Sequence, residues 1–84
     1  MIDYTKFNDD EKRISEKVTF YFAEAIQAHI SLFSGKFENC FIITDLIYSK
    51  TGATYFWIKN LRGESIRIFL RDVMDIEDLK EVKS

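Results

Sequence analysis

The chain contains one long turn-free run, EKRISEKVTFYFAEAIQAHISLFS (residues 11–34), which has no Gly, Pro, Asn or Asp. Apolar residues recur in it every four positions, at Ile14, Val18, Phe22, Ile26 and Ile30. This spacing gives a helix one continuous apolar stripe. We therefore expect one long helix over residues 9–34, after a lead of residues 1–8.

Helix signals and strand signals compete within this run. Asn8 and Glu11 have the spacing of a capping box, and Gly35 can adopt the left-handed conformation that ends a helix. Residues 18–22 and 26–32, however, also alternate in the manner of strands. The alternatives are a strand followed by a shorter helix, or two strands. The link between the two segments is poor hairpin chemistry and good helix chemistry, so the single helix is favoured.

After Gly35 the pattern changes from helical to extended. Three segments rich in strand-forming residues follow, at 37–48, 54–60 and 65–71. Turn residues separate them, and Gly63 supplies the glycine that a tight hairpin needs. We predict an antiparallel three-stranded β-meander over residues 37–71 and a short acidic helix over residues 74–82. The predicted class is α+β, a single domain (residues 1–84) with the long N-terminal helix packed on the meander.

One face of the predicted meander combines aromatic rings with cations. Side chains alternate across a strand, and the aliphatic face must lie under the helix. The opposite face then carries Tyr55, Trp57, Lys59, Arg67, Phe69 and Arg71. Such a face suits a protein–protein interface, and it also suits base stacking with phosphate contact. A third interpretation is that the C-terminal helix, or Tyr4 and Phe7 of the lead, covers the rings.

The first predicted strand is apolar on both sides. Phe41, Ile43 and Ile47 lie on one side, and Cys40, Ile42, Leu46 and Tyr48 lie on the other. An apolar strand left open at a sheet edge promotes aggregation, so we expect something to cover it. The simplest cover is a second copy of the chain seated on Phe41, Ile43 and Ile47, which predicts a homodimer. Insertion of the N-terminal segment beside the strand is the alternative.

The sequence shows no recognisable equipment for catalysis or metal binding. The chain has one His and one Cys, which excludes a four-ligand zinc site of these residues and an intrachain disulfide. No phosphate-binding glycine loop is present. We interpret His29 as a surface or partly buried side chain and Cys40 as a core residue. The acidic residues near the C-terminus are interpreted as a solvated face: Asp72, Asp75, Glu77 and Asp78.

Charge and hydropathy limit the classes of partner that we expect. The net charge of −2 argues against general nucleic-acid binding, although it leaves room for a local basic face. No basic-then-apolar leader opens the chain, and no run approaches the ~20 apolar residues that span a bilayer. We therefore expect a cytoplasmic protein with no cofactor, no metal, no membrane contact and no small-molecule substrate.

The segment Arg71-Asp72-Val73-Met74-Asp75-Ile76-Glu77 resembles the closing part of small Sm-like and SH3-like barrel modules. The resemblance covers about half of the chain, from Gly35 onward, and lacks the Asp-Gly hairpin usual before the second barrel strand. It implies an alternative fold, a small β-barrel with Val18–Phe22 as its first strand. It also implies RNA or protein binding by analogy.

These observations favour a non-enzymatic function. We expect a small acidic regulatory or adaptor protein that acts through protein contacts on the aromatic and basic face and self-associates. Such a chain would suit a bacterial or phage accessory protein. The alternative is single-stranded nucleic-acid binding on the same face.

Overall fold

The computed structural model describes residues 7–80 of the chain. In chain order their elements are α1 (Asp9–Ala23), β1 (Gln27–Leu32), β2 (Gly35–Ile42), β3 (Ile47–Tyr48), β4 (Thr54–Asn60), β5 (Ser65–Phe69), the 3-10 helix η2 (Leu70–Asp72) and β6 (Val73–Asp78). One helix beside one antiparallel sheet confirms the predicted α+β class.

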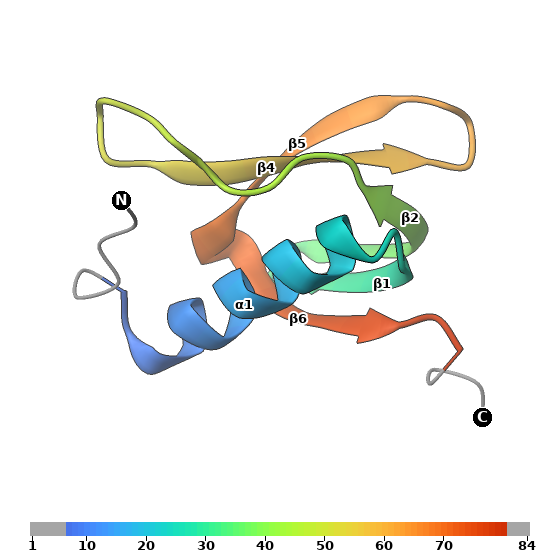
Figure 1. The fold of residues 1–84 in the computed structure, drawn as a ribbon, viewed down its shortest axis with the longest axis horizontal. Helices are drawn as coiled ribbons and strands as arrows, with labels where there is room; N and C mark the ends of the chain where they lie inside the picture. The colour runs from blue at the N-terminus through green and yellow to red at the C-terminus, as the bar shows by residue number, and fades with distance from the viewer. Residues whose placement is uncertain (1–6, 81–84) are drawn as a thin grey trace.

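The strands form one sheet in the order β3-β4-β2-β1-β6, with β5 also paired to β4. β2 and β3 pair with opposite ends of β4 and share one of its edges, whereas β5 runs along the other edge. β5 and β6 are separated only by η2, yet they lie at the two ends of the sheet. The sheet therefore curls, and α1 lies on its open side between the β4–β5 hairpin and β6 (Figure 1).

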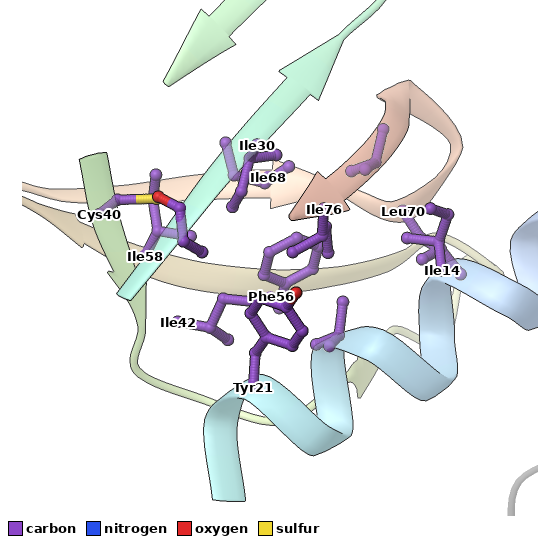
Figure 2. Close-up of a cluster of buried hydrophobic side chains, with 13 residues drawn as sticks. Ile14, Tyr21, Ile30, Cys40, Ile42, Phe56, Ile58, Ile68, Leu70 and Ile76 are labelled. Atoms are coloured by element: carbon purple, nitrogen blue, oxygen red, sulfur yellow. The ribbon is translucent and has the colours of Figure 1, made fainter. Parts of the chain in front are cut away.

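The core lies between the helix and the concave side of the sheet. Ile14 and Tyr21 of α1 point into a cluster to which every strand except β3 contributes (Figure 2). Val18 of α1 is buried in the same cluster. Phe56 and Ile58 of β4 are fully buried in it. The aliphatic side of the β4–β5 hairpin thus faces the helix, as the alternation predicts.

The predicted start of the helix is confirmed by its cap. The Asn8 side-chain oxygen accepts a 2.7 Å hydrogen bond from the Glu11 N–H, and the Glu11 carboxylate accepts one of 3.2 Å from the Asn8 N–H. This reciprocal pair satisfies two amides that the helix leaves unpaired.

The predicted end of the helix at residue 34 is wrong, because α1 stops at Ala23. The Ile26 N–H donates to the Tyr21 carbonyl at 3.1 Å and the Ala25 N–H donates to Phe22 at 3.3 Å, which is the hydrogen-bond pattern of a Schellman motif. Ala25 takes its left-handed position with φ of 52°, where glycine is usual. The chain then enters β1, whose Ala28 and Ile30 are buried.

The predicted C-terminal helix over residues 74–82 is also wrong within the described range, because Val73–Asp78 is strand β6. β1 is paired on one edge by β2, and β6 pairs with its other edge, with Ile76 opposite Ile30. Pairing with β6 gives hydrogen-bond partners to the backbone groups on the second edge of β1, and this gain outweighs the local helical pattern of residues 74–82. Residues 81–82 lie outside the described range.

The three-stranded meander is replaced by a larger sheet. The segment 37–48 divides into β2 and β3, and β2 pairs with β1 as well as β4. The third strand ends at Phe69 rather than at residue 71. The first barrel strand implied by the resemblance, Val18–Phe22, is wrong because these residues are helical.

A charged cluster fastens α1 to the outer edge of β6. The Asp75 carboxylate accepts hydrogen bonds of 2.9 Å from both Arg13 and Lys17. The same two cations donate to strand carbonyls, Arg13 to Met74 at 3.3 Å and Lys17 to Ile76 at 2.8 Å. Partial burial raises the pKa of Asp75, but the bonds from Lys17, Arg13 and the Ile76 N–H outweigh it and hold the pKa below 3.8.

We expect Ala25→Gly to stabilise the protein. The left-handed backbone conformation costs a non-glycine residue ~1–2 kcal/mol, and glycine removes this cost. Glycine also makes the unfolded chain more flexible, which lowers stability by ~0.4–1 kcal/mol, so the free energy of unfolding should rise by about 0.5–1 kcal/mol. The measurement is urea unfolding. Ala23→Gly, in ordinary helical backbone, is the matched control and should destabilise. A loss of stability in Ala25→Gly would contradict the motif.

Asp75→Asn should lower the free energy of unfolding by about 1 kcal/mol at pH 7, a modest value because the side chain is 39% exposed. The folded pKa is lowered, so the contribution is complete above the unfolded pKa near 3.8 and is lost as pH falls through the folded pKa. Urea unfolding at pH 7 and pH 3 should show the gap between wild type and variant closing. Glu38→Gln, in an exposed ion pair with Lys36, should change little at either pH.

Candidate functional site

The β4–β5 hairpin brings five of the six predicted contact residues onto one face of the sheet. Directly paired residues project to the same side of an antiparallel sheet. Tyr55 pairs with Phe69 and Trp57 pairs with Arg67, and Lys59 follows Trp57 on the same side of β4. The sixth residue, Arg71, lies in η2 and reaches back to the ring of Phe69. We call these six residues the aromatic–basic face.

Arg67 is the centre of the aromatic–basic face. Its guanidinium carbon lies 5.4 Å from the ring centroid of Tyr55 and 5.0 Å from that of Phe69. The two rings meet edge to face with centroids 6.1 Å apart, and the guanidinium of Arg71 lies 5.7 Å from the Phe69 ring. Cation–π contacts hold the cations against the rings without neutralising them. The two guanidinium groups of the face therefore lie against its rings and remain charged.

The three cations of this face have no carboxylate partner among the residues that the structure describes. The ion pairs there join Arg13 to Asp10, Arg13 and Lys17 to Asp75, and Lys36 to Glu38. Lys59, Arg67 and Arg71 are all exposed. A protein of net charge −2 thus carries one locally positive surface. Such a surface favours an acidic partner.

The residues predicted for self-association extend the same face. Phe41 pairs with Lys59 and Ile47 pairs with Tyr55, so both project from the outer side of the sheet. Ile43 lies next to Trp57, because its N–H donates to the Trp57 carbonyl at 2.9 Å. Phe41 and Ile43 are 39% and 38% exposed, and Ile47 is partly buried. Two sets of residues predicted separately are therefore one continuous surface.

The predicted open edge is absent for most of segment 37–48, although a homodimer itself stays an untested prediction. β2 lies inside the sheet between β1 and β4, and only the two-residue β3 is a terminal strand. Cys40 and Ile42 are buried in the core of the protein itself. A second copy is not needed to cover β2.

The third interpretation is that other parts of the chain cover the rings, and the structure tests it for residues 73–80 and for Phe7. β6 pairs with β1 at the far end of the sheet, so the strand Val73–Asp78 is not the cover. Phe7 stacks on Tyr48 with centroids 6.4 Å apart, and both line a groove that also includes Phe69, Leu70 and Arg71. This groove borders the aromatic–basic face. Tyr4 lies outside the described residues.

Neither this groove nor the break between β2 and β3 beside Trp57 was predicted from the sequence. Between β2 and β3 the chain no longer pairs with β4. The Trp57 N–H there donates a 3.0 Å hydrogen bond to the Thr44 hydroxyl instead of to the carbonyl of a neighbouring strand. The signal for a break was present in Thr44-Asp45, two polar residues inside an apolar segment. The Phe7–Tyr48 contact joins residues far apart in the chain and has no local signature.

The other titratable candidates lie apart from the aromatic–basic face. His29 is partly buried on β1 and pairs with Glu77 of β6. Asp75 is bound by Arg13 and Lys17, and no group of three or more His, Cys, Asp or Glu in residues 7–80 is arranged to hold a metal ion. Within the same range, the single α-helix is too short and polar to cross a bilayer.

Comparisons with protein-family models, with curated proteins and with solved structures gave no match to this chain.

Cys40 should be unreactive in the folded protein. Burial raises the pKa of its thiol from 9.0 to about 11, and its sulfur lies 3.6 Å from the Ala28 carbonyl oxygen. At pH 8, labelling with Ellman's reagent should be at least ~100-fold slower in buffer than in denaturing urea, because both thiolate fraction and access fall. Equal rates would show that Cys40 is not a core residue.

Proposed function

We propose that this is a small non-enzymatic protein-binding module whose partner contacts the aromatic–basic face. The observation that carries the proposal is the arrangement around Arg67, with one cation over two rings and no carboxylate partner in the described residues. Aromatic and Arg side chains contribute most of the energy at protein interfaces. Contacts between Arg67 and the rings of Tyr55 and Phe69 favour one arrangement before binding, which reduces the side-chain entropy lost on binding.

A partner of different sequence fits better than a second copy. In a twofold dimer built on this face, the patch formed by Lys59, Arg67 and Arg71 would meet the same positive patch of the other copy, and like charges that meet at an interface cost affinity. An acidic surface, or an acidic segment, meets no such penalty. A regulatory or adaptor role, in which the protein carries no chemistry of its own, agrees with this assignment.

The fold supports a related proposal, that the chain is a small barrel of the Sm-like or SH3-like type with an added N-terminal helix. Five strands in the order β6-β1-β2-β4-β5 curl so that the two outermost are consecutive and are joined by one 3-10 turn. The segment Arg71–Glu77, on which the resemblance rests, lies in η2 and the closing strand β6. Fold class alone does not decide the ligand.

Single-stranded nucleic acid is the second candidate, because partly exposed rings between cations also suit bases and phosphates. It is the weaker one. Affinity for nucleic acid grows with the number of phosphates that Lys and Arg contact, and the face carries only three cations. The net charge of the protein is also negative, which opposes binding to a polyanion.

The test is capture of partners by the immobilised protein, followed by calorimetry with the purified partner. Arg67→Glu should weaken that binding by at least ~30-fold, the effect of losing an interface hot spot. Arg62→Glu makes the same charge change in the β4–β5 turn, at an exposed residue outside the face, and should leave the Kd nearly unchanged. A partner that binds both variants equally well would contradict the proposal.

Nucleic acid is tested in parallel with fluorescein-labelled oligo(dT) and oligo(U). We expect no binding at physiological salt. Tight, salt-sensitive binding that disappears in Trp57→Ala and Arg67→Glu but persists in Arg62→Glu would replace the protein-contact proposal with the nucleic-acid one.

A further inference from the structure

Apart from the two-residue strand β3, the curled sheet has two outer strands, and their free edges are not equivalent. An open strand edge offers a row of unpaired backbone groups to any other extended chain. β6 is the edge at one end of the sheet and β5 is the edge at the other. Which of them is available decides whether and how this domain can accept an added strand.

The edge of β6 is closed by α1. The carbonyl groups of Met74 and Ile76, two residues apart, accept hydrogen bonds from Arg13 and Lys17. The N–H of Ile76 donates to the Asp75 carboxylate at 2.9 Å, and that carboxylate is held by the same two cations. Helix side chains therefore occupy the positions that a neighbouring strand would need.

The edge of β5 is open within the described part of the chain. β5 pairs with β4 along its whole length, and no other described strand approaches it. No side chain in residues 7–80 hydrogen-bonds to the backbone of residues 65–69 in the way that Arg13 and Lys17 close β6. Arg67, in the middle of this edge, is exposed and belongs to the aromatic–basic face.

We propose that the open edge of β5 receives an extended acidic segment of a partner protein as an added strand, with carboxylates at alternate positions facing Arg67 and Arg71. The inference rests on the proposed function and specifies the form of the partner. Backbone hydrogen bonds to β5 supply affinity in this mode of recognition, and alternate side chains supply specificity.

A second copy of the chain does not fit this edge. Pairing the whole of Ser65–Phe69 with itself about a twofold axis puts Arg67 directly opposite Arg67 of the other copy, and like charges in that position destabilise a sheet. Pairing β5 with β6 of another copy, the head-to-tail alternative, requires a β6 edge that α1 already occupies. We therefore assign this edge to a segment of a different protein rather than to a second copy.

The chemistry of the added strand follows from the two sides of β5. Arg67 projects to the outer side, where Lys59 and Arg71 lie nearby without carboxylate partners among the described residues, so outward positions of the added strand should be acidic. Ile66 and Ile68 project to the inner side and pack with the core. Inward positions of the added strand should accordingly be aliphatic. The expected pattern alternates acidic and aliphatic residues.

The test begins with selection from a phage-displayed library of random peptides of about a dozen residues, which is long enough to pair with all five residues of β5 and leave flanking residues on both sides. We expect enriched peptides in which Asp or Glu alternates with Val, Ile or Leu. Enrichment of proline-rich, basic or non-alternating peptides, or no enrichment, would overturn the inference. An enriched peptide is then synthesised with a fluorescein label for anisotropy measurements.

Three measurements on that peptide separate strand addition from binding to the face alone. N-methylation of alternate amides on the bonding edge and Arg67→Glu in the protein should each weaken binding at least ~10-fold, whereas Arg62→Glu should not. Amide hydrogen exchange in β5 should slow when the peptide binds. Binding that needs Arg67 but tolerates N-methylation and leaves β5 exchange unchanged would overturn the added strand while leaving the proposed function in place. Binding that also ignores Arg67→Glu would contradict both.

Discussion

The structure depends on the burial of one helix stripe against a sheet that would otherwise be open. Ile14, Val18 and Tyr21 close the concave side of the sheet and complete a core shared by the strands. A domain of this length buries only ~60–65% of the surface that its unfolded chain exposes, so such closure matters more than in a larger protein. The same helix brings Arg13 and Lys17 to β6. One element thus completes the core and protects an edge.

The packing of the helix on the sheet also determines which side chains form the candidate site. Because Phe56 and Ile58 must point toward the helix, the residues between and beside them must point away. Pairing of β4 with β5 then sets Tyr55 against Phe69 and Trp57 against Arg67. No separate folding requirement creates the aromatic–basic face. The rings of Tyr55, Trp57 and Phe69 stay only partly buried on this outer side.

How much of this could be predicted depended on whether each feature was local. The cap of α1 was predictable because Asn8 and Glu11 are three residues apart, and the outer side of the hairpin was predictable from alternation alone. The end of α1 was not, because Ala25 adopts a conformation that favours glycine and the sequence carries no signal of it. β6 was mistaken for a helix because its partner strand lies more than forty residues earlier in the chain. The extension of the site to Phe41 and Ile47 likewise needed the strand register.

The position of Trp57 has a practical consequence. It is the only tryptophan in the chain, and it is partly buried in the middle of the aromatic–basic face rather than in the core. The indole is therefore a built-in optical reporter of whatever covers that surface. A shift in its emission would register occupancy without any label, and the same signal would register loss of the hairpin on unfolding.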